Sequence, residues 1–448
     1  MQTNLADFIK NSPEGQEAEA ILRACVHCGF CLATCPTYQL LGDELDSPRG
    51  RIYLIKQVLE GQPVTQKTQL HLDRCLTCRA CETVCPSGVR YGRLVDIGRG
   101  IVEKQVGRTV TASAMRYALR QTLPDSGVFA SLLKLGRLVR PLLPEKLKLS
   151  IPPAALTPGT WPAPQHPRTM LVLDGCVQPV LAPNINSAAA RVLDTLGISL
   201  VKAENAGCCG AVSYHLNAQQ EGLDHMRRNV DAWWPFVENK TDNAAGHGVE
   251  AIVMTASGCG VTVKEYGHLL RHDPKYAGKA ARISELTRDI SEILAAEMGK
   301  GVPLFSNSAL DTEKSKLSFH SPCTLQHGMQ IRDVVEKILI TAGFELTAVP
   351  DAHLCCGSAG TYSILQPELS QQLLKNKLAA LESGSPDQIA TANIGCLMHL
   401  QSGTPLPVRH WIEVLDERVE KLERAWKMPI SGNTVRPDSL TGLHEPGS

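Results

Sequence analysis

The sequence predicts an α+β multidomain protein, in which a mostly helical N-terminal domain is followed by a pseudo-two-fold α/β domain of two Cys-Cys-Gly repeats. Three observations support this fold class. The chain has 448 residues, which is enough for two or three domains of ordinary size. Eight of its sixteen cysteines lie within the first 100 residues. From residue 170 onward, short apolar strands alternate with helical segments in two successive copies, which is typical of parallel α/β units.

The N-terminal domain, residues 1–100, contains one cysteine pattern twice. The copies are Cys25-x2-Cys28-x2-Cys31-x3-Cys35-Pro36 and Cys75-x2-Cys78-x2-Cys81-x3-Cys85-Pro86. Three closely spaced thiolates wrap three corners of a cubane cluster, and the fourth cysteine of each copy reaches the neighbouring cluster. The pattern therefore predicts two [4Fe–4S] clusters in a ferredoxin-like (alpha-helical ferredoxin) domain. The expected ligands are Cys25, Cys28, Cys31 and Cys85 for the first cluster, and Cys75, Cys78, Cys81 and Cys35 for the second.

Structural zinc is the alternative occupant for sets of four cysteines. Zinc sites normally use two separated Cys-x2-Cys pairs, whereas here three evenly spaced cysteines precede Cys-Pro in both copies. The spacing therefore favours iron–sulfur clusters over zinc.

A helix is expected between the two cysteine motifs, over residues 52–59. Ser47 can cap its N-terminus, and Pro48 suits the first helical position. Arg49 and Arg51 could donate hydrogen bonds towards a cluster or a partner, or could serve only the start of the helix.

Residues 101–150 form a basic, helix-like segment without cysteine, and residues 151–169 form a proline-rich linker. Within the basic segment, residues 129–147 have apolar side chains at helical spacing, with Lys134, Arg137 and Arg140 between them. Such a stretch can lie on an anionic membrane surface, or it can pack on the N-terminal domain with its basic face in water. The tail, residues 428–448, is rich in Gly, Pro and Ser and is expected to be disordered.

The α/β domain repeats internally, with the first repeat over residues 170–310 and the second over residues 311–425. Each copy begins with an apolar strand ending in cysteine, continues through a helix and a strand to Cys-Cys-Gly, and ends with a long helix, a strand and a fourth cysteine. Cysteines just past strand ends fall where parallel sheets build their sites. The expected strands include 170–176, 251–256, 316–323 and 388–392, and the expected helices include 186–196, 219–237, 331–342 and 367–381.

Each repeat thus offers four thiols as candidate ligands. They are Cys176, Cys208, Cys209 and Cys259 in the first repeat, and Cys323, Cys355, Cys356 and Cys396 in the second. Four thiolates can bind a further iron–sulfur cluster or zinc. The alternative is a set of buried reduced thiols, since free cysteine often lies in cores. Two matched sets of four are hard to obtain by accident, so we expect a metal or a cluster here.

Composition narrows the class of protein further. Acidic and basic residues balance at 45 each, which gives no reason to expect a nucleic-acid partner. No run of 18 or more apolar residues occurs, and the first 13 residues do not resemble a signal peptide. Cysteine in a reducing compartment is more often a metal ligand than a disulfide. We therefore expect a cytoplasmic protein, peripheral on the inner membrane.

The chain resembles the two-domain iron–sulfur subunits of membrane-associated dehydrogenases, and among them the glycolate oxidase iron–sulfur subunits. The resemblance covers roughly residues 20–420 and is carried by ACVHCGFCLATCPTYQLLGDELDSPRGRIYLIKQVLEG (24–61), CLTCRACETVCPSGVRYG (75–92) and HLCCGSAGTY (353–362). Family members consist of a double-cluster ferredoxin module followed by two Cys-Cys-Gly repeats. The iron–sulfur subunits of anaerobic glycerol-3-phosphate dehydrogenase and of lactate-utilisation systems share this plan and remain alternatives.

The resemblance implies an electron-transfer subunit of a complex. Two FAD-binding flavoprotein-type chains would oxidise glycolate to glyoxylate, with D-lactate as a related substrate, and electrons would pass through this chain towards the quinone pool. The chain itself shows no Gly-rich flavin-binding segment. We therefore expect a subunit that is not catalytic alone, in an oxidoreductase that acts on CH–OH groups with a non-NAD acceptor.

Heterodisulfide reductase subunits are related but differ at the end of each repeat, where Cys-x2-Cys supplies a fifth cysteine to an unusual cluster. Here the third residue after Cys259 is Thr262, and the third residue after Cys396 is His399. His399 is therefore an additional candidate nitrogen ligand. The missing fifth cysteine argues against a self-contained, heterodisulfide reductase-like catalyst, which is the competing class of function.

Overall fold

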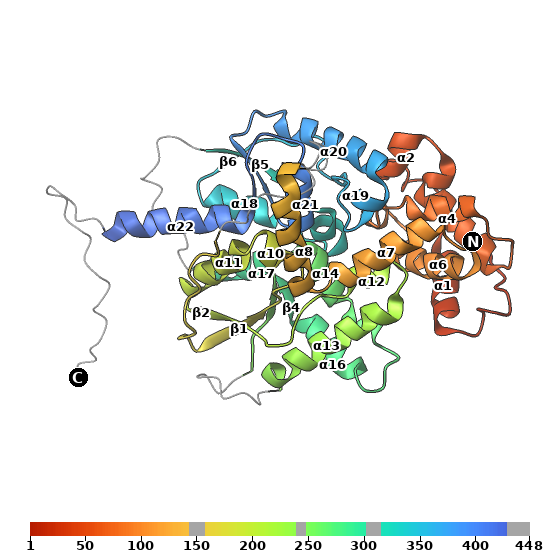
Figure 1. Cartoon of the computed structure of the whole chain (residues 1–448), viewed down its shortest axis with the longest axis horizontal. Coiled ribbons are helices and arrows are strands. Elements are labelled where there is room, and N and C mark those ends of the chain that lie inside the picture. Colours follow the sequence, from red (N-terminus) through yellow and green to blue (C-terminus); the bar gives the residue numbers. More distant parts are fainter. Residues whose placement is uncertain (143–156, 239–247, 302–314, 428–448) are drawn as a thin grey trace, which may run out of the picture.

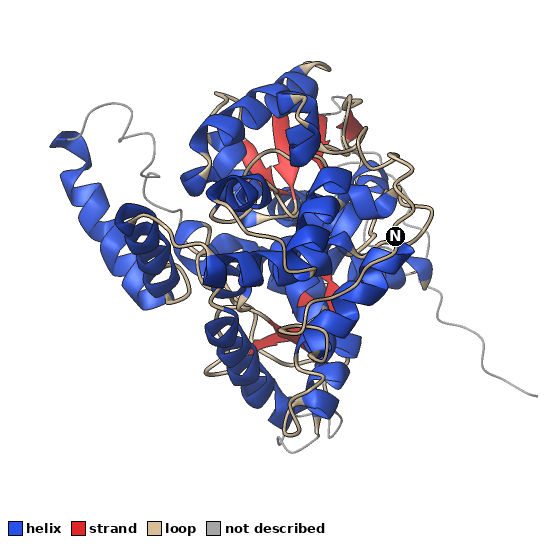
Figure 2. Cartoon of the chain, turned by 90° about the vertical axis from the view of Figure 1, so that its right-hand side faces the viewer, coloured by secondary structure: helices blue, strands red, loops and turns tan. Residues whose placement is uncertain are grey.

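The computed structural model describes residues 1–142, 157–238, 248–301 and 315–427 (Figure 1). The N-terminal helices, red to orange in Figure 1, lie at one end of the molecule. The two repeats lie together beside them, and the last helix projects from the opposite end. Figure 2 shows the strands in two separate groups, each enclosed by helices. The expected tail, residues 428–448, lies outside the described residues.

The N-terminal module is entirely helical. Its elements are α1 (Pro13–Ala24), α2 (Pro36–Leu41), the 3-10 helix η1 (Glu44–Asp46), α3 (Pro48–Leu59), α4 (Gln66–Asp73), α5 (Ala80–Thr83) and α6 (Tyr91–Gln105). The start of α3 is as predicted, because the Ser47 hydroxyl accepts a hydrogen bond from the Gly50 amide at 2.9 Å and Pro48 takes the first helical position. Ile55 and Leu94 are fully buried in the core of the module. Cys25, Cys75 and Cys81 are buried members of the same core.

Two further helices follow the module, α7 (Val110–Thr122) and α8 (Ser126–Val139), with a short 3-10 turn, η2 (Arg140–Leu142). Arg116 of α7 pairs with Asp73, which ties α7 to the module. By contrast, α8 has no buried side chain. It lies against α7 and against α10 (Gln178–Leu181) of the first repeat. The alternative in which this helix packs on the N-terminal module is therefore not what the structure shows.

The described part of the proline-rich segment, residues 157–167, is attached to the first repeat. The Trp161 indole donates to the carbonyl of Leu200 at 3.1 Å. The amides of Gln165 and His166 both donate to the Ser199 hydroxyl. The chain therefore runs along a strand before entering the sheet.

The first repeat is a four-stranded parallel sheet covered by helices. Its elements are β1 (Arg168–Val172), α10, α11 (Asn184–Asp194), β2 (Ile198–Lys202), α12 (Ala211–His215), α13 (Gln219–Val237), β3 (Ile252–Met254), α14 (Ser257–Lys264), α15 (Tyr266–Leu269), α16 (Ala277–Leu286), β4 (Thr287–Asp289) and α17 (Ile290–Gly299).

The second repeat contains β5 (Lys316–His320), the single-turn π-helix η3 (Thr324–Gly328), α18 (Val334–Thr341), β6 (Glu345–Leu346), α19 (Tyr362–Leu365), α20 (Pro367–Glu382), β7 (Gln388–Thr391), α21 (Ile394–Gln401), β8 (Val408–His410) and α22 (Trp411–Lys427).

The two sheets have the same topology, with strand orders β2-β1-β3-β4 and β6-β5-β7-β8, and every pairing is parallel. The predicted fold class is confirmed. The sequence analysis missed the short fourth strand of each sheet, because β4 and β8 have only three residues each and run directly into a helix. One hydrophobic core extends through both repeats, from Ile185 and Val253 to Ile389 and Trp411.

The module docks on both repeats through polar contacts. Glu17 of α1 pairs with His268 and Arg271 of the first repeat. Thr83 of α5 is hydrogen-bonded to His327 of the second repeat at 3.0 Å. These contacts fix the cysteine loops of the module against the α/β domain.

Candidate functional site

One cavity lies between α3, α5 and α6, and cysteines form part of its wall. The structure brings four of the predicted ligands into its wall, namely Cys35, Cys75, Cys78 and Cys81. Cys35 belongs to the first motif and the other three to the second. The fourth cysteine of the first motif thus lies with the first three of the second.

A second cavity shows the reciprocal arrangement. Its wall contains Cys25, Cys28, Cys31 and Cys85. Cys28 is exposed, and the neighbouring Val26 and Phe30 expose 66% and 63% of their surface. This cavity therefore lies at the surface of the molecule, beside an apolar rim.

The two cavities share part of their walls. Pro48, Cys81 and Tyr91 line both of them. The Tyr91 hydroxyl donates to the Cys75 sulfur at 3.6 Å. Groups bound in the two cavities would therefore be immediate neighbours.

Cationic side chains surround the inner cavity. Burial alone would raise the pKa of the Cys75 thiol, but the positive charges of Arg51 and Arg99 outweigh burial and lower that pKa. Arg99 also donates to the carbonyl of Cys75 at 2.6 Å. The two arginines thus favour a thiolate at Cys75, whereas burial raises the pKa of Cys78 and of Cys81 well above the usual value.

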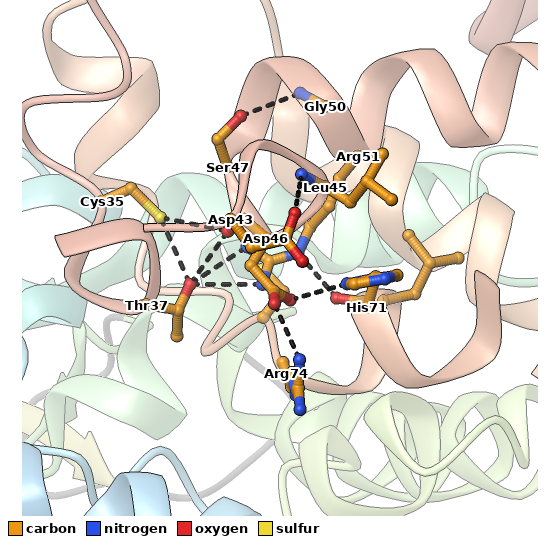
Figure 3. A network of polar contacts seen from close by, with 12 residues as sticks. Cys35, Thr37, Asp43, Leu45, Asp46, Ser47, Gly50, Arg51, His71 and Arg74 are labelled. Carbon is orange, nitrogen blue, oxygen red and sulfur yellow. Dashed lines mark hydrogen bonds and ion pairs between the residues drawn. The ribbon is translucent and has the colours of Figure 1, made fainter. Parts of the chain in front are cut away.

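Arg51 is held in place by a buried network around Asp46 (Figure 3). The Asp46 carboxylate pairs with Arg51 at 3.2 Å, with Arg74 at 2.8 Å and with His71 at 3.1 Å. Arg51 also donates to the Thr37 hydroxyl, which lies 3.3 Å from the Cys35 sulfur. The sequence analysis left the role of Arg51 open, and the structure places it in the wall of the inner cavity, which its helix-start position did not reveal.

The Cys-Cys-Gly motifs form equivalent turns in the two repeats. Gly210 and Gly357 have φ of 91° and 92°, a region that favours glycine. A Cβ atom on Gly210 would lie 2.5 Å from the Gly222 carbonyl oxygen, and one on Gly357 would lie 2.7 Å from the Ser370 carbonyl oxygen. Glycine is therefore required for the backbone to turn after each cysteine pair.

These turns also direct amides at sulfur. The Gly210 amide donates to Cys208, and the Gly357 amide donates to Cys355, both at 3.4 Å. In the first repeat, a hydrogen bond from the Cys176 thiol holds the pKa of Cys208 well below its usual value. The fourth thiol, Cys259, is hydrogen-bonded to Cys209.

The four thiols of the second repeat form a row. Cys323 and Cys355 lie 3.9 Å apart, and Cys356 is hydrogen-bonded to both Cys355 and Cys396. One donor atom from each of His320, Cys356 and Cys396 lies within 4.8 Å of the others. Burial lowers the pKa of His320 to about 3.

His399, the histidine singled out from the sequence, is not in that group. Its Nε2 atom is hydrogen-bonded to the Ser370 hydroxyl at 3.2 Å, and burial lowers its pKa. The sequence analysis did not identify His320, because the Cys-x2-Cys spacing of the related family points to position 399 alone. The available signal was its position at the end of an apolar strand, three residues before Cys323.

The inner cavity adjoins the thiol row of the second repeat. Cys78 and Cys323 both pack on one hydrophobic cluster, which includes Leu76, Cys355 and Tyr362. The Tyr362 hydroxyl also donates to the Arg74 carbonyl at 3.1 Å. The inner cavity therefore faces the second repeat, whereas the outer cavity faces solvent.

Comparison with known proteins gives a consistent result. The model of the 4Fe-4S dicluster domain matches residues 21–89, and that of the cysteine-rich domain matches residues 170–264 and 317–401. The chain is 56% identical to the glycolate oxidase iron-sulfur subunit of Escherichia coli over 94% of its own length and 100% of the relative. The chain belongs to the family of glycolate oxidase iron–sulfur subunits. It is an iron–sulfur protein with an oxidoreductase role.

More distant relatives share this organisation. A probable glycolate oxidase iron-sulfur subunit of Bacillus subtilis is 30% identical over 88% of this chain and 92% of the relative. Lactate utilization protein A of Bacillus licheniformis is 27% identical over 54% of this chain and 97% of its own length. A crystal structure of a hypothetical protein from Helicobacter pylori superposes with a TM-score of 0.48 at 8% identity, covering 91% of this chain and 73% of that chain, which is too weak to support any inference.

Proposed function

We propose that this chain is the electron-transfer subunit of a glycolate dehydrogenase complex. A flavoprotein subunit removes two electrons and two protons from glycolate to give glyoxylate, with D-lactate as a second substrate. This chain accepts the electrons and passes them towards a quinone. The observation that carries the proposal is the pair of adjoining cysteine-lined cavities, one open to solvent and one facing the α/β domain.

The residues present fit two [4Fe–4S] clusters. The inner cavity has four cysteines in its wall and the outer cavity has five, because Cys81 lines both. Apart from this shared residue, the two sets are those that the cross-over of the two motifs predicts. In this proposal Cys25, Cys28, Cys31 and Cys85 hold the outer cluster, and Cys75, Cys78, Cys81 and Cys35 hold the inner one. When bound, each cluster can take up and release one electron. Arg51 and Arg99 balance the negative charge of the inner site, and the buried walls exclude water from it.

The direction of transfer follows from the exposure of the two sites. The outer cavity, rimmed by Val26, Cys28 and Phe30, is the face at which a flavoprotein subunit can bring its cofactor close. The inner cavity adjoins Cys323 and Cys355, so the second repeat lies beyond it. We therefore assign entry to the outer face and exit to the side of the α/β domain.

A self-contained disulfide-reducing catalyst is less well supported. Such an enzyme must bring a substrate disulfide to a reactive thiol pair. Cys208, Cys209, Cys355 and Cys356 are all buried. The iron–sulfur subunit of a lactate or glycerol-3-phosphate dehydrogenase complex stays as the second candidate, because the similarity to lactate utilization protein A supports the same electron-transfer plan.

The proposal includes peripheral attachment to the inner membrane through α8. Large apolar residues at helical spacing are exposed along one stripe of α8 and η2, namely Val128, Leu132, Leu135, Val139 and Leu142. Lys134 lies beside this stripe and is exposed. A basic helix with an exposed apolar face matches an anionic lipid surface. None of the helices in the described part of the chain has the length and apolarity needed to cross a bilayer.

The test is anaerobic reconstitution with the flavoprotein subunits. Glycolate should reduce the clusters of the assembled complex, and a soluble quinone should reoxidise them. The isolated chain should show no glycolate oxidation. Cluster reduction by D-lactate or glycerol 3-phosphate but not by glycolate would contradict the substrate assignment.

A further inference from the structure

Tyr91 lines both cavities of the module and is held firmly in place there. It is the first residue of α6 and is 3% exposed. Its backbone amide donates to the Val89 carbonyl at 2.9 Å, and the next amide, that of Gly92, donates to the Glu82 carboxylate at 2.5 Å. Glu82 belongs to α5, inside the second cysteine motif. The start of α6, and Tyr91 with it, is therefore fixed to the second cysteine loop.

The Tyr91 hydroxyl has a single hydrogen-bond acceptor among the described residues, the Cys75 sulfur at 3.6 Å. The Thr37 hydroxyl differs in this respect. It lies 3.3 Å from the Cys35 sulfur and 3.2 Å from the Asp46 carbonyl oxygen, so its proton has two acceptors within reach. Of these two hydroxyls at the inner site, that of Tyr91 is the one directed at sulfur alone.

The surroundings of Tyr91 keep the proton on its hydroxyl. Burial, as the larger cause, and the negative charge of Cys75 raise the pKa of Tyr91 well above its usual value. Arg51 acts in the opposite direction without reversing the shift. The phenol therefore stays neutral, and remains a hydrogen-bond donor, at neutral and mildly alkaline pH.

The sulfurs of the outer site receive a different kind of donor. The Val89 amide donates to the Cys85 sulfur at 3.5 Å. The Thr34 hydroxyl lies near Cys31, but it donates to the Cys31 carbonyl oxygen and not to the sulfur. In the part of the chain that the structure describes, no side-chain hydroxyl is hydrogen-bonded to an outer-site sulfur, namely that of Cys25, Cys28, Cys31 or Cys85. A hydroxyl donor thus distinguishes the inner site from the outer one.

A hydrogen bond to a ligand sulfur acts on the charge of a cluster. Reduction adds one negative charge, and a donor beside the sulfur stabilises that charge, so the reduction potential rises. The Tyr91 hydroxyl is bonded to an inner-site sulfur, whereas the outer cavity is in contact with this residue only as part of its wall. Removal of the hydroxyl should therefore lower the potential of the inner site more than that of the outer site.

We propose that Tyr91 is a positioning residue for electron transfer, which acts through Cys75 and raises the reduction potential of the inner site relative to the outer one. An electron that enters at the outer site then moves inward, so that the outer site is reoxidised as the inner site is reduced. This inference rests on the proposed electron-transfer function and its assignment of clusters to the two cavities. It does not depend on the substrate of the complex.

The test is an anaerobic redox titration of the full-length chain with its clusters bound, followed by electron paramagnetic resonance. Tyr91→Phe keeps the ring, so the iron content should stay that of the wild type while one midpoint potential falls. The equilibrium of one electron between the two sites should shift about three- to tenfold towards the outer site, the effect of losing one ordinary hydrogen bond. Electron–nuclear double resonance in H₂O and D₂O should also lose the signal of one exchangeable proton.

Two cysteine variants assign the shift to a site. In the module, Cys28→Ala keeps only the inner cluster and Cys78→Ala keeps only the outer one. Adding Tyr91→Phe should lower the potential in the first background and change it much less in the second. If a background loses its remaining cluster, the exchangeable-proton signal of Tyr91→Phe alone decides.

Tyr53→Phe is the matched control, because Tyr53 is an exposed tyrosine of α3 and its loss of a hydroxyl should leave both potentials unchanged. Equal shifts in the two cysteine backgrounds would overturn the proposal. So would Tyr91→Phe with unchanged potentials and an unchanged proton signal. Failure of glycolate to reduce the chain would contradict the proposed function, but it would leave these chemical titrations valid.

Discussion

Arg79 and Glu265 form a two-pronged ion pair across the boundary between the N-terminal module and the first repeat, with N–O distances of 2.5 and 3.0 Å. Arg79 lies between Cys78 and Cys81, inside the second cysteine loop. Arg93 of α6 also pairs with Glu265 at 3.1 Å. One carboxylate of the α/β domain thus holds two arginines of the module, one of them within a cysteine motif.

Replacing Glu265 by Gln should weaken the docking of the module. The substitution leaves the largely buried Arg79 and Arg93 without their counter-charge, which we expect to cost about 1–3 kcal/mol. Thermal unfolding of the anaerobic holoprotein measures the loss. The matched control is Glu285→Gln, because Glu285 forms an exposed pair with Arg282 and should change stability by less than about 0.5 kcal/mol. Equal effects of the two variants would contradict the role of Glu265.

The cross-over of ligands predicts a specific pattern of iron loss. Cys28→Ala and Cys85→Ala should each remove about four irons, and the double variant should remove no more, because both residues serve the outer site. The combination Cys78→Ala with Cys85→Ala should remove about eight. Ligation by each motif separately would reverse the results for the two double variants, so iron and acid-labile sulfide analysis decides between them.

Arg51 should raise the reduction potential of the inner site. Its charge stabilises the more negative, reduced state, so Arg51→Leu should lower one midpoint potential by about 50–100 mV, while Arg51→Lys should lower it much less. Redox titration followed by electron paramagnetic resonance measures both potentials. An unchanged potential in Arg51→Leu, with both clusters present, would show that the Asp46 network only supports the fold.

Glu17 should make the docking of α1 dependent on pH. Burial would raise its pKa, but His268 and Arg271 outweigh burial and lower the pKa from 4.5 to about 2. The ionised carboxylate therefore stabilises the folded state above pH 4.5, and this contribution is lost as the pH falls towards 2. As the pH is lowered from 5 towards 3, anaerobic urea unfolding should show a smaller loss of stability in Glu17→Gln than in the wild type. Parallel curves for the two proteins would exclude this contribution.

The apolar stripe of α8 should bind lipid. The wild-type complex is expected to co-sediment with vesicles containing anionic lipid, and Leu132→Glu with Leu135→Glu should abolish this without changing iron content. The control pair is Val110→Glu with Met115→Glu, two exposed apolar residues of α7. The α8 variant could still co-sediment with the vesicles but fail to bind the flavoprotein subunits. In that case the stripe is a protein interface and the membrane proposal is wrong.

The sequence was sufficient for the fold class and for most elements, for clear physical reasons. Apolar residues recur at characteristic spacings in strands and in helices, so the two kinds of element can be told apart in the sequence. The pattern correctly placed the starts of α13 and α20 at Gln219 and Pro367. The N-cap at Ser47 was readable because capping depends on neighbouring residues alone. The cysteine sets were found because their spacing reflects a fixed local geometry.

Contacts between distant segments were not predictable in this way. Arg79 and Glu265 are 186 residues apart, and nothing in either segment indicates the other. His320 was passed over because its neighbours Cys356 and Cys396 come together only through the pairing of β5 with β7. The sequence also did not show that α8 has no buried side chain. An apolar stripe has the same spacing whether or not another element covers it.

Because Pro48, Cys81 and Tyr91 line both cavities of the module, the two sites cannot be redesigned independently. Enlarging one pocket, or altering its polarity for a different metal centre, changes a surface that the other pocket also uses. Natural variation faces the same restriction, since a change at any of these three positions acts on both sites at once. The module is therefore best treated, in engineering as in evolution, as a single unit with two centres.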